Sequence, residues 1–222
     1  MNIDLLDSFL RGVAANNSRP WLAEHRDTYD TLRAEWLADL DRLCAAMSQW
    51  CPGMATQNGR SSTYRFFRDT RFSPDKSPLK TFFSASLSPH GRKSHYAGYY
   101  MQVGPEGIAQ NGLWGGIYCP DSTMLRKLRK AIVDNIEEFE GIINAPDIKR
   151  LYPGWEGDRL KSAPQGWPRN HPQIELLKLK DYGKFHQLPL DFFRSPTWPE
   201  EASELLRPLA PLVDFINYSL DE

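Results

Sequence analysis

Basic side chains gather in one stretch of this sequence, between residues 60 and 93. Eight basic residues stand there against two acidic ones, which gives a local charge of +6 in a chain whose formal net charge is −1. Arginine binds carboxylate and phosphate groups through two parallel hydrogen bonds, so several arginines together can hold a dianion. The basic residues are Arg60, Arg65, Arg68, Arg71, Lys76, Lys80, Arg92 and Lys93.

The loop from Arg68 to Lys80 is the predicted site of an anionic ligand that bears a phosphate or a carboxylate. In a strand, Arg65 and Arg68 would point to opposite faces, so the loop has to bring the later cations back toward one of them. If the protein is an enzyme, the candidate general bases are Asp69 and Asp75, and His95 is a further acid–base candidate. The predicted ligand-binding residues are Arg65, Arg68, Arg71, Lys76 and Lys80.

Two other interpretations of this stretch stay open. In one, Asp69 and Asp75 pair with the arginines and only fix the shape of the loop. In the other, the basic surface belongs to a non-catalytic module that docks a protein or a nucleic acid. The near-neutral total charge argues against non-specific coating of nucleic acid, which depends on neutralising many phosphates. A small anionic molecule is therefore the favoured partner.

Metal and cofactor chemistry is disfavoured. No cysteine or carboxylate flanks His90 and His95 at a recognised ligand spacing, and the neighbouring Arg92 and Lys93 repel a cation. The sequence also lacks GxSxG, GxxxxGK[ST], GxGxxG and HExxH, which lowers the expectation of a familiar hydrolase, nucleotide-binding fold or zinc protease. We predict no metal and no cofactor, and the sequence assigns no reaction.

The elements that must position these residues follow from periodicity. Apolar residues at helical spacing predict a helix over residues 3–15 and a long one over residues 20–49. Asn17 or Ser18 would cap the second helix, and Pro20 fits its first turn.

Strand-like segments come next. Aromatic and branched residues indicate strands at 63–68, 81–87, 97–103 and 113–118, and residues 182–188 are predicted to return as an edge strand. Gly112, Gly115 and Gly116 around Trp114 predict a bulge or a close approach to the backbone.

Further helices are predicted after the strands. Asp121 would cap one of them, and the acidic segment from Pro199 to Leu220 should be helical but split by Pro208 and Pro211. We therefore predict an α+β fold, in which an antiparallel sheet of about four to five strands packs with several helices. The predicted domains are a single domain over residues 1–193 and an acidic C-terminal helical extension, packed on it, over residues 194–222.

The predicted location is the cytoplasm. Three cysteines, Cys44, Cys51 and Cys119, form no CxxC pair, and we interpret them as buried, reduced thiols. The first residues show no long apolar run of a signal peptide, and no segment approaches the roughly twenty apolar residues of a membrane span. The sequence leaves the oligomeric state open.

One resemblance adds to this interpretation. The run Arg68-Asp69-Thr70-Arg71-Phe72-Ser73-Pro74-Asp75-Lys76-Ser77-Pro78, followed by Lys80-Thr81, resembles the signature of a bacterial family catalogued as domain of unknown function 2461. Gly91-Arg92-Lys93 with Gly98-Tyr99-Tyr100, and Leu160-Lys161 ahead of His171-Pro172, fit the same family, so the resemblance covers roughly residues 5–190. It implies a bacterial protein of unknown activity and lends no catalytic residues.

Overall fold

Polar caps start the first two helices, and the sequence predicts the second of these caps. In the computed structural model of the protein, which describes residues 1–221, helix α1 spans Ile3–Ala15. The side chain of Asn2 accepts a hydrogen bond from the Leu5 N–H at 3.1 Å at its start. Ser18 caps α2 (Arg19–Glu24) in the same way, with Pro20 in the first turn.

The predicted long helix over residues 20–49 is wrong in one respect, because it is two helices. Helix α3 covers Arg26–Met47, and His25, with φ −107° and ψ 23°, separates it from α2. The His25 ring stacks on Trp21 with centroids 3.8 Å apart, and its Nδ1 donates to the Trp21 carbonyl at 2.9 Å. This side chain competes for a carbonyl of the preceding turn, which favours a break at this residue.

The remaining helices include the predicted pair at the C-terminus and several that lie between strands. Asp121 caps α5 through hydrogen bonds from the N–H groups of Thr123 and Met124, as predicted. The prolines at 208 and 211 divide the last helical segment, which is also confirmed. The elements are η1 (Pro52–Thr56), α4 (Gly59–Ser62), α5 (Ser122–Asp134), α6 (Ile136–Ile143), α7 (Pro146–Leu151), α8 (Ile174–Leu177), η2 (Leu190–Arg194), α9 (Trp198–Leu206), η3 (Arg207–Leu209) and α10 (Ala210–Asp221).

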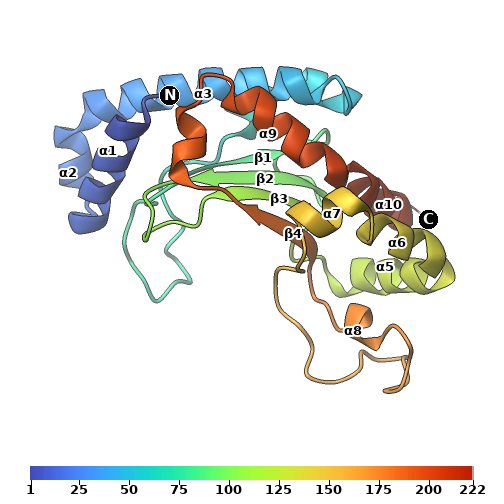
Figure 1. Cartoon of the computed structure of the whole chain (residues 1–222). Helices are drawn as coiled ribbons and strands as arrows, with labels where there is room; N and C mark the ends of the chain where they lie inside the picture. Colours follow the sequence, from blue (N-terminus) through green and yellow to red (C-terminus); the bar gives the residue numbers. More distant parts are fainter. Residues whose placement is uncertain (222) are drawn as a thin grey trace. The chain divides into compact units, whose positions relative to one another are not determined.

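Four strands form one antiparallel sheet in the order β1-β2-β3-β4, so each strand pairs with its neighbour in sequence (Figure 1). The predicted α+β fold and the number of strands are confirmed. The strands are β1 (Phe83–Leu87), β2 (Gly98–Val103), β3 (Gly112–Ile117) and β4 (Tyr182–Gln187).

The strand predicted over residues 63–68 is not formed. Only two isolated bridges occur there, between Thr63 and Ala85 and between Phe67 and Leu79. Next to the second bridge, the Pro78 carbonyl accepts from the Arg68 N–H at 2.9 Å, but Pro78 has no N–H to donate back to Arg68. The ladder therefore stops after single bridges, and the chain is free to turn into the loop.

Two compact units make up the chain. The first contains residues 1–92, 100–113 and 187–205, and the second contains residues 93–99, 114–186 and 206–222. The predicted division into residues 1–193 and 194–222 stays a prediction, and residue 222 lies outside the described residues.

Helix α3 is the central element of the first unit. It packs against α1, α2 and α4 and buries Leu32, Trp36, Leu40 and Leu43. The Trp36 indole donates from Nε1 to Thr63 Oγ1 at 3.0 Å, which fixes the segment after α4 against the helix. The helix thus places its residues beside the residues that precede β1.

In the second unit, α10 packs against α5 and α6. Gly116 has φ +140°, and a Cβ there would collide with the carbonyl oxygen of Tyr182, so the predicted close approach near Trp114 is the backbone of β4. Cys119 is exposed whereas Cys44 is buried, so the prediction that all three thiols are buried is wrong. None of the helices described for residues 1–221 is long and apolar enough to cross a membrane.

Candidate functional site

Three cations of the loop from Arg68 to Lys80 interact with other residues of the same loop. Arg68 pairs with Asp75, and Arg71 pairs with Asp69 at 2.8 Å between Nη2 and Oδ2. Lys76 donates from Nζ to the carbonyl of Thr70 at 2.9 Å. The structure therefore gives Arg68, Arg71 and Lys76 partners within the loop.

The two carboxylates of the loop have low pKa values. The Arg71 side chain and N–H lower the pKa of Asp69 to about 2, and Ser77, followed by Arg68, lowers the pKa of Asp75 to about 2. A general base works best when its pKa lies near the operating pH, so carboxylates in this state are weak bases at neutral pH. The third catalytic candidate, His95, is exposed and belongs to the second unit.

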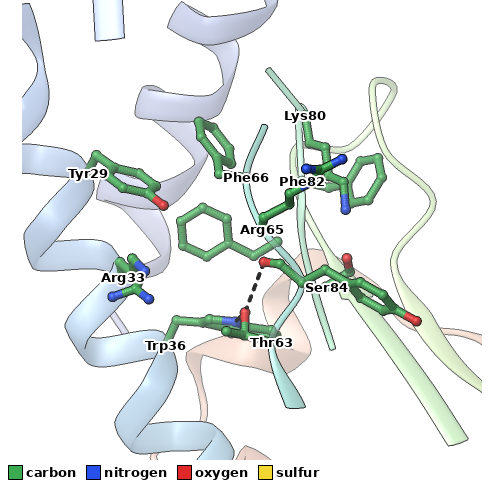
Figure 2. A pocket seen from close by; sticks show the side chains of 11 residues that line it. Tyr29, Arg33, Trp36, Thr63, Arg65, Phe66, Lys80, Phe82 and Ser84 are labelled. Carbon is green, nitrogen blue, oxygen red and sulfur yellow. Dashed lines mark hydrogen bonds between the residues drawn. The ribbon is translucent and has the colours of Figure 1, made fainter. Parts of the chain in front are cut away.

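The other two predicted ligand-binding residues, Arg65 and Lys80, line a small recess of the first unit, which we call the Lys80 recess. It encloses about 20 Å³. Figure 2 shows Tyr29, Arg33 and Trp36 entering it from α3, across from Arg65, Lys80 and Phe82. The residues that line it are Tyr29, Arg33, Trp36, Thr63, Tyr64, Arg65, Phe66, Lys80, Phe82, Phe83 and Ser84.

Charge in the Lys80 recess is of one sign. Arg33, Arg65 and Lys80 are cations, and none of the eleven lining residues is acidic. Burial, and then the charges of Arg65 and Arg92, lower the pKa of Lys80. Arg65 also lies 3.6 Å from Asp69, but this ion pair is exposed and thus weak. The recess is therefore electropositive and lacks a carboxylate of its own.

Aromatic rings hold the Lys80 ammonium. Its Nζ lies 5.0 Å from the ring centroid of Tyr64 and 5.6 Å from that of Phe82. The Arg92 guanidinium lies over the same Tyr64 ring at 5.9 Å. Among residues 1–221, no carboxylate or carbonyl is found as a hydrogen-bond partner of Lys80 Nζ. Cation–π contact only partly replaces the hydration that burial removes.

A buried hydroxyl is also unsatisfied in the recess. Ser84 is 3% exposed, and its Oγ finds no hydrogen-bond partner in the part of the chain that the structure describes. The neighbouring Thr63 hydroxyl, in contrast, accepts from Trp36, as the dashed line in Figure 2 marks. A buried polar atom without a partner points to a missing ligand or water.

Arg33 and Ser84, two lining residues that could contact an anion, are not among the ligand-binding residues predicted from the sequence. Arg33 lies beside the apolar stripe of α3, seven residues after Arg26 and four after Tyr29. That spacing shows a shared helix face but not which segment faces it. Ser84 occurs in a strand-like run and carries no signal of its own. Arg92 was counted in the basic stretch but not among the ligand-binding residues.

No group of three or more His, Cys, Asp or Glu side chains that could hold a metal ion occurs within residues 1–221.

Comparisons with known proteins give a family but no relative of known activity. No curated protein and no solved structure matches the chain at a significant level. A family model described as "Conserved hypothetical protein (DUF2461)" matches residues 6–215, which include the loop and every residue of the Lys80 recess. The chain belongs to this family of conserved hypothetical proteins.

Proposed function

We propose that the protein binds the anionic end group of a small ligand, a phosphate or a carboxylate, in the Lys80 recess. The observation that carries this proposal is Lys80 itself, a half-buried ammonium without a hydrogen-bonding anion partner among residues 1–221, beside Arg65 and across from Arg33. Burying a charge without a partner is unfavourable. An anion in the recess would remove that penalty.

The size of the recess limits what enters it. About 20 Å³ is room for one water-sized group, since a cavity needs roughly 10–15 Å³ to hold a water. Arg33 and Arg65 are exposed, so they can reach the part of the ligand that stays outside. One oxygen of the ligand's end group, rather than the whole phosphate or carboxylate, would therefore enter the recess and contact Lys80 and Ser84.

The donors present suit an oxyanion. Lys80 would supply a charge-assisted hydrogen bond, the Ser84 hydroxyl a neutral one, and an arginine the two parallel bonds that a carboxylate or phosphate accepts. The lining contains no histidine and no carboxylate, and burial raises the pKa of its Tyr29. These groups support binding better than acid–base catalysis.

Thermal unfolding in phosphate tests the proposal. Phosphate at ten times its dissociation constant should add about 1.4 kcal/mol of stability to the native protein. Sodium chloride of equal ionic strength should not, and Lys80→Met should lose the gain. Arg71→Met is the matched control, because it removes a loop cation that pairs with Asp69 outside the recess. Equal stabilisation of both variants, or none of the native protein, would overturn the proposal.

A second candidate function is docking of a protein or nucleic acid through the basic loop. Phe72 is 93% exposed, and the Arg71 guanidinium lies 5.7 Å from its ring. Exposed aromatic and arginine side chains are enriched in interfaces. If this candidate is right, Phe72→Ala should abolish capture of a partner and leave phosphate binding unchanged.

A cytoplasmic location in a bacterium is also part of the proposal. Cys44 and Cys119 are free thiols, as expected of a reducing compartment.

A further inference from the structure

A second depression of the first unit, which we call the Phe67 groove, shares its flanking segments with the Lys80 recess. It has a volume of about 400 Å³. Its lining residues are Arg19, Leu22, Ala23, Arg26 and Phe67. It is therefore much larger than the recess, and its lining differs, with one aromatic ring, two aliphatic side chains and two arginines.

The order of the lining residues puts the groove next to the recess. Helix α3 gives Arg26 to the groove and Arg33 to the recess, and seven residues of helix span about 10 Å. The segment before the loop gives Phe67 to the groove and Arg65 to the recess. The Arg26 guanidinium also lies 5.7 Å from the ring centroid of Tyr29, which lines the recess.

The Phe67 groove suits a flat, π-bonded ring. Phe67 is 39% exposed, so one part of its ring is open to a ligand. The Arg19 guanidinium lies 6.0 Å from the ring centroid of Phe67, and Arg26 lines the same groove. Aromatic rings and guanidinium planes are the surfaces on which nucleobases stack.

We propose that the ligand is a mononucleotide, whose terminal phosphate places one oxygen in the Lys80 recess and whose base stacks on Phe67. This inference rests on the proposed function. The separation of Arg26 and Arg33 along α3, about 10 Å, is of the order of the distance between the phosphate and the base of a nucleotide. A sugar phosphate would fill only one of the two depressions.

A mononucleotide fits better than a nucleic acid strand. A recess of about 20 Å³ admits one oxygen of a terminal group but not a chain that runs through it. The chain as a whole carries a formal charge of −1, which provides little general attraction for a polyanion.

Isothermal titration with adenosine 5′-monophosphate and ribose 5-phosphate tests the inference. The nucleotide should bind about tenfold or more tightly than the sugar phosphate, as expected for one stacked base. Phe67→Ala should remove that difference without weakening ribose 5-phosphate, and Lys80→Met should abolish binding of both. Phe72→Ala is the matched control, since it removes an exposed phenylalanine outside the groove and should bind like the native protein.

The outcomes separate the two proposals. If both compounds bind with equal affinity, or if Phe67→Ala leaves the difference intact, the mononucleotide inference fails and anion binding stands. If neither compound nor inorganic phosphate binds, the proposed function fails as well. Circular dichroism of each variant checks that the substitution leaves the fold intact.

Discussion

Lys80 of the first unit and Lys184 of the second are both partly or wholly buried lysines that contact aromatic rings. Lys184 is 3% exposed, lies 4.4 Å from the ring centroid of Trp155, and donates from Nζ to the carbonyls of Tyr152 at 3.0 Å and Gly154 at 3.2 Å. Lys80 lies against two rings but finds no such acceptor among residues 1–221. Burial lowers the pKa of both, that of Lys184 to about 8.

This difference separates a structural lysine from a candidate binding lysine. The carbonyls that Lys184 contacts belong to the segment after α7, so its hydrogen bonds fix that segment on β4. The fold therefore explains why Lys184 is buried. Lys80 is less deeply buried but lacks the same compensation, and its neighbours Arg65 and Arg92 add repulsion. A ligand is the simplest account of that arrangement.

Replacing each lysine by alanine should give the largest difference between the two sites, measured as the change in the free energy of unfolding. Lys184→Ala removes the donor to two carbonyls and the contact with Trp155, so it should lower the free energy of unfolding by about 2–4 kcal/mol. Lys80→Ala should change it by less than about 1 kcal/mol in the absence of ligand. Urea unfolding followed by tryptophan fluorescence measures both. Equal losses would show that Lys80 is as structural as Lys184.

The pH dependence of stability tests the state of Lys184. Its folded pKa of about 8 is below the roughly 10.4 of an unfolded lysine, so the unfolded chain binds more protons between these values. This residue should therefore add stability as the pH rises from 8 to 10, on the order of 2 kcal/mol. Lys184→Met should lack that increment in urea titrations at the two pH values. A parallel pH dependence of both proteins would contradict the assignment.

Removal of the Ser84 hydroxyl should have a smaller effect, of the opposite sign. Its Oγ is buried without a partner within the described chain, so Ser84→Ala should leave stability unchanged or raise it by about 0.5–1 kcal/mol without ligand. The same variant should weaken phosphate binding several-fold. A loss of more than about 1 kcal/mol in urea unfolding would instead show that the hydroxyl has a partner. Thr63→Val is a useful comparison, because the Thr63 hydroxyl does accept a hydrogen bond.

Local sequence patterns predict helices and strands well where a capping residue, a proline or the regular spacing of apolar residues determines them. The helix at residues 3–15, the Asp121 cap and the prolines at 208 and 211 are confirmed. The break at His25 was missed because it depends on one ring contacting one carbonyl. The strand expected at 63–68 fails because the segment that pairs with Phe67 contains Pro78, which has no N–H to donate to the ladder.

The residues of the candidate site are also predicted only in part, because some of them come together only through tertiary contacts. Composition locates Arg65 and Lys80, because the charge of the stretch is visible in the sequence. It cannot separate them from Arg68 and Arg71, whose partners Asp75 and Asp69 depend on how the loop closes. Arg33 enters the recess only because α3 lies beside the segment before β1, which is a tertiary contact. The charge of each residue can thus be read from the sequence, whereas the fold determines which charged residues come together.

The smallest expected effect comes from changes in the loop from Arg68 to Lys80. Its cations Arg68, Arg71 and Lys76 have partners within the loop, whereas Lys80 has no hydrogen-bonding anion partner among residues 1–221. The pKa values of Asp69 and Asp75, about 2, lie below the usual 3.9 of an unfolded aspartate. Their contribution to loop order is therefore present above pH 3.9 and is lost as the pH falls through about 2.

Cleavage after the exposed Phe72 by chymotrypsin at neutral pH should be several-fold faster in Asp75→Asn, which loses the Arg68 pair. The melting temperature of Asp75→Asn should stay within a degree or so of the native value, since exposed ion pairs add little global stability. Phosphate stabilisation should also persist in this variant, because neither Asp75 nor Arg68 lines the Lys80 recess. If Asp75→Asn loses phosphate binding together with loop order, the binding site includes the loop and the distinction between the two groups of cations is wrong.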